Sequence, residues 1–351
     1  MRLDREEEKV ANRVKSFFAN EPKYEFEKVA GVGAFAVTLC YRNRDAGPSE
    51  YRRIAVKAIT GSSADIGSEI EFLKSLIWAQ HIVTIISIPL QSSETRWLKD
   101  NTIITEYLEN GTLDQLKKRL GRYNHSPRKL PNRVLWAIFL CRSTKGFILE
   151  KIPAPLETTL LKESSNTALV ARGCVGMAYP PPGPRKAPRG PRDQLLETIP
   201  DEDKYRTPND LAHGDLHSGN IMLGDLGRDE HSRFPLLKFI DFGLASRGTE
   251  NAVEENISAI GAVMCELILQ SGDIHRLIDD KRGANVQDPD LDPELLMIVA
   301  QCVAEEPARR PSLSRLLSII RSMLRRTYPD IREETDAYIS ELVQNNIFNA
   351  A

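Results

Sequence analysis

Cysteine is scarce in this chain of 351 residues, and the few cysteines do not group. The five thiols, at Cys40, Cys141, Cys174, Cys265 and Cys302, include no CxxC pair and have no histidine at metal-site spacing. A zinc site and a disulfide framework are both disfavoured, because each needs cysteines at a recognisable spacing. We expect reduced thiols with a structural role.

Long apolar runs and an excess of one charge are also missing. The longest apolar runs, such as 81–90, are far too short to span a bilayer. The first ten residues, MRLDREEEKV, are charged where a secretory signal needs an apolar stretch. Basic and acidic residues nearly cancel, 47 against 49, which argues against a general nucleic-acid binder or a polybasic membrane anchor. We expect an intracellular protein, cytoplasmic or nuclear, with neither nucleic acid nor membrane as partner.

The composition, 41% hydrophobic and 27% charged, predicts a folded core. Apolar residues at helical spacing in 5–20 predict an amphipathic helix within an N-terminal extension, 1–22. Short β-prone runs broken by glycines and charged turns then predict a small antiparallel sheet with one helix, 23–109. Its strands are expected at Tyr24–Val29, Phe35–Tyr41, Arg53–Ala58, Val83–Ile88 and Asn101–Tyr107, and its helix at Ser68–Ile77.

From residue 110 onward the periodicity becomes mostly helical. These elements predict a larger, mainly α-helical part, 110–326, followed by a helical tail, 327–351. The fold class is therefore α+β, with a small sheet-bearing lobe before a larger helical lobe. The helices of the larger lobe are expected at Thr112–Leu120, Asn132–Cys141, Val253–Gln270, Pro293–Val303 and Ser312–Arg326.

Two stretches interrupt this plan. Tyr179–Arg192, YPPPGPRKAPRGPR, is so rich in proline and glycine that we expect an extended, mobile loop with solvated basic residues. Residues 142–168 interrupt an apolar helical pattern. They are either an insertion that loops out locally or a gene-model error such as a retained intron. We place insertions at about 142–168 and 180–207.

Three patterns could carry chemistry. The first is GVGAFA, in which Gly31 and Gly33 lie in a turn between two expected strands and Ala36 stands where a third glycine would be. Glycines let backbone amides approach phosphate oxygens, although they also serve ordinary tight turns. The second is AVKAI, which puts Lys57 on a strand between apolar neighbours. A buried cation needs a counter-charge, and Glu69 on the following helix is the expected partner.

The third pattern is the most specific: HGDLHSGN, 213–220, followed by IDFG, 240–243. Asn220 precedes a short apolar strand, and Asp241 follows another one. Two hard oxygen ligands at strand ends suit a magnesium ion that bridges nucleotide phosphates. Asp215 then remains free to orient a hydroxyl group. The alternative is that these side chains only cap turns.

Taken in order, these residues resemble the protein kinase superfamily over roughly Tyr24–Arg325. The hinge-like TEYLENGTL, 105–113, and EEPARRPSLSRLL, with Arg310 and Pro311, belong to the same resemblance. The chain looks like a divergent, fungal-type kinase-like domain with HGD in place of HRD. The resemblance implies a bilobal protein-kinase-like fold and a phosphotransferase that uses ATP and Mg2+. Its acceptor would be a hydroxyl, most often a serine or threonine of a protein.

The resemblance also implies a role for each residue. Lys57 would hold the α- and β-phosphates, and Glu69 would fix its position. Asp215 would orient the attacking hydroxyl and accept its proton, while Asn220 and Asp241 would bind Mg2+. The other residues implied are Gly31, Gly33 and Ala36 over the phosphates, the backbone of Glu106 and Leu108 at the adenine edge, Ala55 within the nucleotide site, Thr105 as gate of the adenine pocket, and His217 as a weaker γ-phosphate partner.

The sequence departs from the family on the acceptor side. Gly214 replaces the arginine of HRD, which removes the usual docking site for an activation-loop phosphate. His217 replaces the usual lysine. Only thirteen residues, Leu244–Asn256, run from DFG into the following helix, and no APE motif is present. Little backbone is left for a peptide groove, and Arg310 lacks its usual glutamate partner.

Two alternatives therefore stay open. HGDLHSGN is also similar to the catalytic loop of aminoglycoside and choline kinase-like enzymes, which phosphorylate small molecules and lack a long activation segment. The other alternative is a nucleotide-binding pseudokinase or scaffold. ENISAIGAVMCELI, 255–268, and EEPARRPSLSRLL favour the protein-kinase-like interpretation, because they resemble helices of that family's large lobe.

Overall fold

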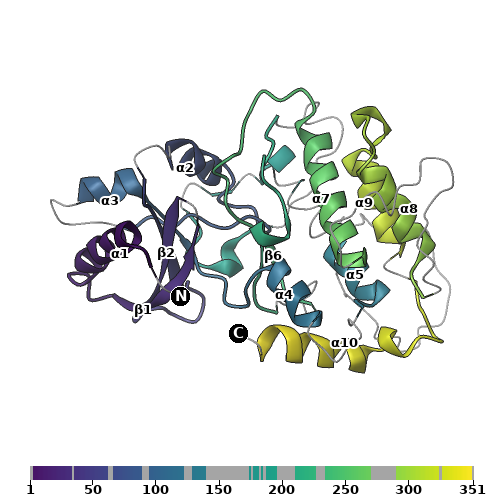
Figure 1. Ribbon diagram of the computed structural model, residues 1–351, viewed down its shortest axis with the longest axis horizontal. Coiled ribbons are helices and arrows are strands. Elements are labelled where there is room, and N and C mark those ends of the chain that lie inside the picture. The colour runs from purple at the N-terminus through teal and green to yellow at the C-terminus, as the bar shows by residue number, and fades with distance from the viewer. Residues whose placement is uncertain are drawn as a thin grey trace, which may run out of the picture.

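The protein combines a four-stranded antiparallel sheet with a larger helical part, so the expected α+β class is confirmed. The sheet lies at one end of the molecule and most of the helices at the other, an arrangement compatible with two lobes (Figure 1). The segment 142–168 lies outside the described residues. This computed structural model describes residues 3–33, 35–61, 66–88, 95–121, 129–139, 174, 177–181, 183–184, 187–195, 210–226, 234–269, 290–323 and 326–349.

Each strand of the sheet pairs with the next one along the chain. Buried and half-exposed residues alternate along much of the third strand, as expected where one face packs on a core. Lys57 and Ala55 share the half-exposed face, and Val56 lies on the buried one. The strands are β1 (Tyr24–Val32), β2 (Ala36–Asn43), β3 (Arg53–Ile59) and β4 (Thr102–Glu106).

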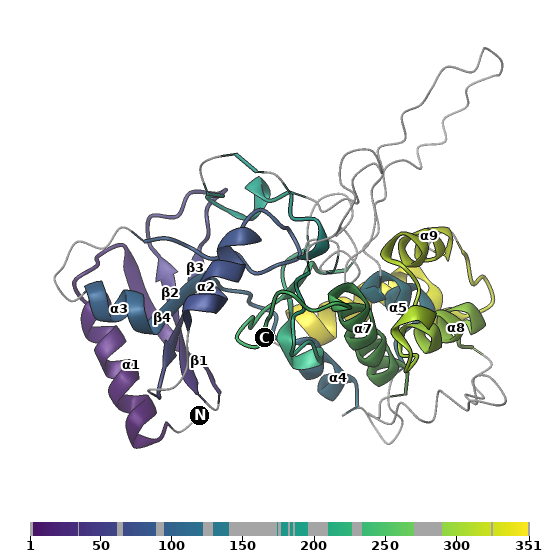
Figure 2. The ribbon, with the colours of Figure 1, turned by 90° about the horizontal axis from the view of Figure 1, so that it is seen from above.

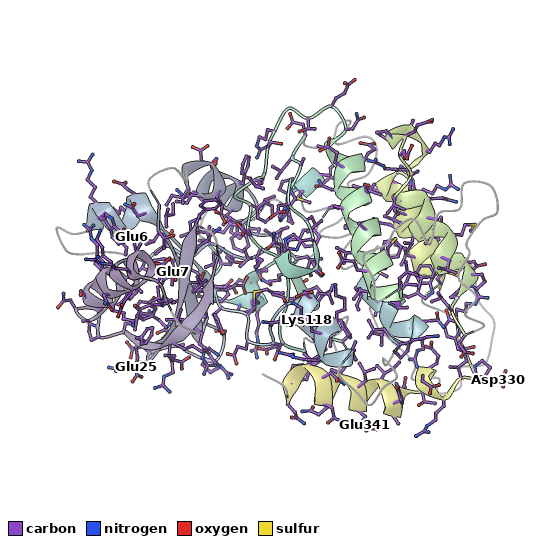
Figure 3. The ribbon with its side chains drawn as sticks, in the orientation of Figure 1. Glu6, Glu7, Glu25, Lys118, Asp330 and Glu341 are labelled. Carbon is purple, nitrogen blue, oxygen red and sulfur yellow. The ribbon has the colours of Figure 1, made fainter. Side chains whose placement is uncertain are left out.

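Helix α1 (Arg5–Phe18) covers the buried face of the sheet (Figure 1). Its N-cap is Asp4, whose carboxylate accepts hydrogen bonds from the amides of Glu6 and Glu7. The Glu7 side chain accepts from the Asp4 amide in return, and this capping box stabilises the first turn. Figure 3 labels both glutamates on this helix. The side chains that α1 buries in the core with the sheet are Val10, Ala11, Val14, Phe17 and Phe18.

Two further helices accompany the sheet, so the expectation of a single helix is wrong. Helix α2 (Ile66–Ser75) corresponds to the expected one and carries Glu69. The additional helix is α3 (Thr95–Asn101), which contributes Leu98 to the core beneath α1. Its sequence, TRWLKDN, has too few apolar positions to show helical periodicity.

The expected strand Val83–Ile88 is also wrong. This stretch lies along β4 but forms only an isolated bridge there, between Ile85 and Thr105. A side chain interrupts the ladder, because the Thr84 amide donates to the Glu106 carboxylate at 2.9 Å. In a regular antiparallel pair that amide would donate to a main-chain carbonyl.

The helical part surrounds α7 (Ala252–Leu269), the longest of the described helices. Figure 2 shows α5 (Asn132–Phe139), α8 (Pro293–Cys302) and α9 (Leu313–Met323) close to it. One apolar core joins these helices to α2. The remaining elements are α4 (Leu113–Leu120), the antiparallel pair β5 (Ile221–Leu223) and β6 (Leu237–Phe239), and 3-10 turns at Pro191–Asp193, Ser218–Asn220, Pro307–Arg309 and Arg332–Glu334.

The described residues of the Pro-rich stretch Tyr179–Arg192 form no strand or α-helix, as expected for a loop, but part of the stretch is closely packed. Gly190 packs against the backbone of Ser49 so closely that a Cβ atom would lie 1.7 Å from the Ser49 carbonyl oxygen. Just beyond it, Leu195 forms a bridge with Ala79. Glycine therefore permits close packing at residue 190, and the chain from Gly190 to Leu195 contacts the sheet-bearing part.

The C-terminal tail is helical, with α10 (Asp336–Val343) followed by a π-helical turn (Gln344–Phe348). It runs below the helical part towards the middle of the molecule (Figure 1). There the Asn346 carbonyl accepts a hydrogen bond of 3.0 Å from Arg119 at the end of α4. None of the helices in the described part of the chain is long and apolar enough to cross a membrane.

Candidate functional site

An ammonium group and two carboxylates from distant parts of the chain meet beside the sheet. Lys57 Nζ on β3 lies 3.0 Å from Glu69 Oε2 on α2 and 2.7 Å from Asp241 Oδ1 after β6. The second carboxylate oxygen of Glu69 lies 3.1 Å from the same nitrogen. The pairing of Lys57 with Glu69 that the sequence predicts is therefore present. Asp241 joins it from 184 positions along the chain.

Burial and neighbouring charges shift the pKa values of Lys57 and Asp241 in opposite directions. Burial alone would lower the pKa of Lys57, but Glu69 and Asp241 raise that pKa above its usual value. Burial would raise the pKa of Asp241, yet the Lys57 ammonium holds that pKa below its usual range. Both groups therefore stay charged at neutral pH. Their side chains keep 29% and 44% of their surface exposed, so a ligand can reach them.

The backbone holds Asp241 in an uncommon conformation. Its φ of +62° lies in the left-handed region, which residues other than glycine seldom adopt. The next residue, Phe242, is fully buried, and its ring centroid lies 4.5 Å from that of His213. Such strain persists where the surroundings over-determine it, and it gathers at functional sites. The turn places Phe242 in the core while Asp241 contacts Lys57.

His213 has a structural role in the loop that precedes Asp215. Its ring Nε2 lies 3.1 Å from the Ile240 carbonyl oxygen. Its amide donates to the side-chain oxygen of Asn256 on α7, and the Asn256 side chain donates to the Leu211 carbonyl, both at 2.9 Å. Burial lowers the pKa of His213, so the imidazole is neutral at pH 7.

Asp215 and Asn220 lie together in one loop. The Asn220 side chain donates to the Asp215 carbonyl (2.8 Å) and to Asp215 Oδ2 (3.1 Å). His217 Nδ1 accepts from the Gly219 amide at 3.0 Å, and its Nε2 lies 3.7 Å from Asp215 Oδ2. His217 thus caps the turn with its ring near Asp215. Because the amide nitrogen of Asn220 is engaged, its side-chain oxygen is the atom that could bind a cation.

The pairing of β5 with β6 brings Asn220 close to Asp241. Ile221 faces Phe239 in the register, and the Ile240 amide donates to the Asn220 carbonyl at 3.0 Å. No group of three or more His, Cys, Asp or Glu among the described residues is placed to hold a metal ion. A cation bound here would need Asn220, Asp241 and oxygens of a ligand or water.

The turn between β1 and β2 is open around its glycines. A Cβ atom on Gly31 would meet nothing within 4 Å, and one on Gly33 would lie 3.8 Å from the Ala36 carbonyl oxygen. Neither glycine has a positive φ. Since neither packing nor backbone conformation requires glycine at these positions, the space is available to a ligand.

The end of β4 offers one free acceptor and one free donor. Ala55 and Thr105 pair across β3 and β4. The Glu106 amide donates to the Thr84 carbonyl at 3.0 Å, but the Thr84 amide bonds to the Glu106 side chain. The Glu106 carbonyl is therefore left outside this ladder. Within the described ranges, the Leu108 amide has no hydrogen-bond partner.

Glu106 also belongs to a buried network that the sequence analysis missed. Lys238 on β6 is 1% exposed, and its Nζ lies 2.5 Å from Glu106 Oε1 and 2.6 Å from Gln194 Oε1. Gln194 donates in turn to the Thr84 hydroxyl. The sequence does contain a signal for this buried lysine, because Lys238 lies between apolar residues in FPLLKFID just as Lys57 does in AVKAI. The network joins β4 and β6 to Gln194, which follows the Pro-rich stretch.

The short segment between Asp241 and α7 is fixed to the rest of the site. Ala212 and Ser246 exchange two main-chain hydrogen bonds of 3.0 Å. The Gly248 amide donates to the Asp210 carboxylate at 2.8 Å. These bonds hold the segment against the chain that leads into the loop of Asp215.

Arg247 connects the same segment to α2. Its guanidinium donates to Ser75 Oγ at 3.2 Å and lies 5.7 Å from the centroid of the Phe72 ring, within the range of a cation–π contact. Because α2 also carries Glu69, this contact couples the segment after Asp241 to the helix that positions Lys57.

The backbone conformation and the packing at position 214 require glycine. Its φ is +77°, and a Cβ atom would lie 2.1 Å from the Leu244 carbonyl oxygen. We expect Gly214→Ala to lower the free energy of unfolding by at least about 1–2 kcal/mol, since a side chain disfavours the left-handed region and also meets backbone. Urea denaturation measures this loss. Gly31→Ala is the matched control and should lose no stability; equal behaviour of the two variants would contradict the close packing at Gly214.

Among the described residues, Arg310 forms no ion pair with a carboxylate. It bonds to main-chain carbonyls instead, those of Ala304 at 2.9 Å, Glu254 at 3.0 Å and Glu305 at 3.3 Å. Arg310 therefore ties the end of α8 to the first turn of α7.

No known protein-family model matches the chain, and no curated protein matches it. The function is therefore inferred from the geometry of the site.

Proposed function

We propose that the protein is a phosphotransferase that uses ATP and Mg2+ and has a protein-kinase-like fold. The phosphate would pass to a hydroxyl acceptor, a serine or threonine of a protein. The observation that carries this proposal is the meeting of Lys57, Glu69 and Asp241 within 2.7–3.1 Å. A reachable cation held by two carboxylates, next to an open glycine turn, suits a triphosphate and its metal ion.

In this proposal Lys57 binds the α- and β-phosphate oxygens, and Glu69 keeps the ammonium in place. The Asp241 carboxylate and the Asn220 side-chain oxygen hold Mg2+, which neutralises charge on the phosphates when bound. Gly31 and Gly33 give the turn between β1 and β2 room to approach the phosphates.

The end of β4 would receive the adenine. The Glu106 carbonyl can accept from the exocyclic amino group, and the Leu108 amide can donate to a ring nitrogen. Ala55 and Thr105, paired across the two strands, would flank the base. This arrangement uses the two main-chain groups that the sheet leaves without partners.

Asp215 would act on the acceptor. Its carboxylate is oriented by the Asn220 side chain and can accept the proton of the hydroxyl while the hydroxyl oxygen attacks the γ-phosphorus and ADP leaves. Catalysis would come from positioning and charge neutralisation, with no covalent enzyme intermediate.

Binding of Mg2+ and ATP is expected to stabilise the folded protein. At a concentration of 100 times Kd, a ligand adds about 2.7 kcal/mol to the free energy of unfolding, which raises Tm by several degrees. Lys57→Met should lose most of this increase, because it removes the cation for the phosphates. Lys74→Met, at an exposed lysine of α2, should keep it. Differential scanning fluorimetry with and without EDTA measures the change, and an unchanged Tm of the wild type would overturn the proposal.

A small-molecule kinase is the second candidate, which the shortness of the segment between Asp241 and α7 favours. Transfer of labelled γ-phosphate to panels of proteins and of small alcohols distinguishes the two. Binding of ATP without transfer to any acceptor would instead indicate a nucleotide-binding scaffold.

A further inference from the structure

A pocket of about 280 Å³ lies between the loop that carries Asp215 and the first turns of α7. This volume is at the lower end of the range for ligand sites, so the pocket suits one side chain or one small molecule. It adjoins the carboxylate to which we assign the acceptor hydroxyl. The residues that line it are Gly214, Asp215, Leu216, Glu255, Asn256 and Ala259.

The course of the chain before α7 leaves this space open. The segment that follows Asp241 is bonded to Ala212 through Ser246. Its Leu244 carbonyl lies against Gly214. The segment therefore runs beside the loop, and the pocket remains between Asp215 and α7.

The polar lining of the pocket is negative. Glu255 is exposed and takes part in none of the ion pairs of the described residues. Asp215 supplies the second carboxylate. The other polar side chain, that of Asn256, is occupied by His213 and Leu211. Glu255 is thus the lining group that is free to pair with a cation from outside.

The rest of the lining is apolar. Leu216 and Ala259 form part of the wall, and Gly214 adds no polar side chain. An apolar wall that ends in an unpaired carboxylate matches a long basic side chain, whose aliphatic stem packs on carbon while its head reaches the charge.

We infer that the acceptor is a peptide in which a lysine or arginine lies close to the serine or threonine that is phosphorylated. The basic side chain occupies the pocket and pairs with Glu255, and the hydroxyl meets Asp215. This inference rests on the proposed function, since it names the acceptor class of the same site.

The test is transfer of labelled γ-phosphate by the full chain to two serine peptides that differ only by arginine or glutamine beside the serine. For the wild type, kcat/KM should be higher with the basic peptide. Glu255→Gln should lower kcat/KM for that peptide about fivefold, the upper end for an ion pair at an exposed carboxylate. The substitution should raise KM for the basic peptide, and kcat/KM for the glutamine peptide should stay the same. Glu250→Gln, at an exposed acid just before α7 and outside the pocket, is the matched control.

Each other outcome has its own meaning. Equal use of the two peptides, or an unchanged preference in Glu255→Gln, would overturn the inference while transfer itself supports the proposed function. Transfer to ethanolamine or another small amino alcohol, with neither peptide used, would also overturn it. Failure of the wild type to transfer phosphate to any acceptor would remove both the inference and the proposed function.

Discussion

Asp215→Ala is expected to lower kcat for phosphate transfer by about 10²–10⁴, the range that a positioned general base contributes. Within the described ranges, the polar contacts of the Asp215 carboxylate are with Asn220 and His217 of its own loop, so the loss should appear in the chemical step. A transfer assay at saturating ATP and acceptor measures it. The increase of Tm with Mg2+ and ATP should persist, because Asp215 is assigned no contact with the nucleotide.

Asp241→Asn is the informative control for this result. Asp241 lies on the proposed nucleotide side, 2.7 Å from Lys57, so its variant should lose both transfer and the ATP-dependent increase of Tm. If Asp215→Ala kept more than a tenth of the wild-type kcat, the proton would have to go elsewhere. The assignment of Asp215 as base would then be wrong.

Lys238→Met is expected to lower the free energy of unfolding by about 3–5 kcal/mol, the loss typical of breaking a buried ion pair. Glu106 would keep its negative charge in a site where it is only 4% exposed, and Gln194 would lose the donor to its side-chain oxygen. Urea denaturation followed by circular dichroism measures the loss.

Two further variants separate charge from packing. In the double variant Lys238→Met with Glu106→Gln, the charge left unpaired is removed and an acceptor for the Thr84 amide remains, so at least half of the stability should return. Lys118→Met breaks an exposed pair with Asp114 on α4 (Figure 3), and its loss should stay below about 1 kcal/mol. A similar small loss in Lys238→Met would show that the buried pair is energetically unimportant.

The sequence predicts those parts of the site that follow from local rules. A lysine between apolar neighbours on a strand needs an anion, and this reasoning found Glu69 for Lys57. The period of apolar residues found α1 and most helices of the larger part, and their observed ends differ from the expected ones by a few residues at most. The same rule applied to Lys238 would have called for a buried acid, although the identity of Glu106 as that acid depends on how β4 and β6 meet.

Contacts between distant segments explain what sequence reasoning could not predict. The stretch around Thr84 has the composition of a strand, but the Glu106 side chain replaces a carbonyl in its ladder. The proline and glycine content of Tyr179–Arg192 indicates a loop, but this composition would be the same whether or not Gly190 packed on Ser49. In each case the decisive partner comes from a part of the chain that no local pattern identifies.

The attachment of Gln194 to Lys238 has a practical consequence for protein engineering. A Pro-rich stretch invites deletion when a shorter, better crystallising fragment is wanted. Here such a deletion, if it reached Gln194, would take away one of the two oxygen acceptors of a lysine that water cannot reach. Trimming should therefore also spare Gly183, where a Cβ atom would lie 2.0 Å from the Trp78 ring, because close packing extends at least that far before Gln194.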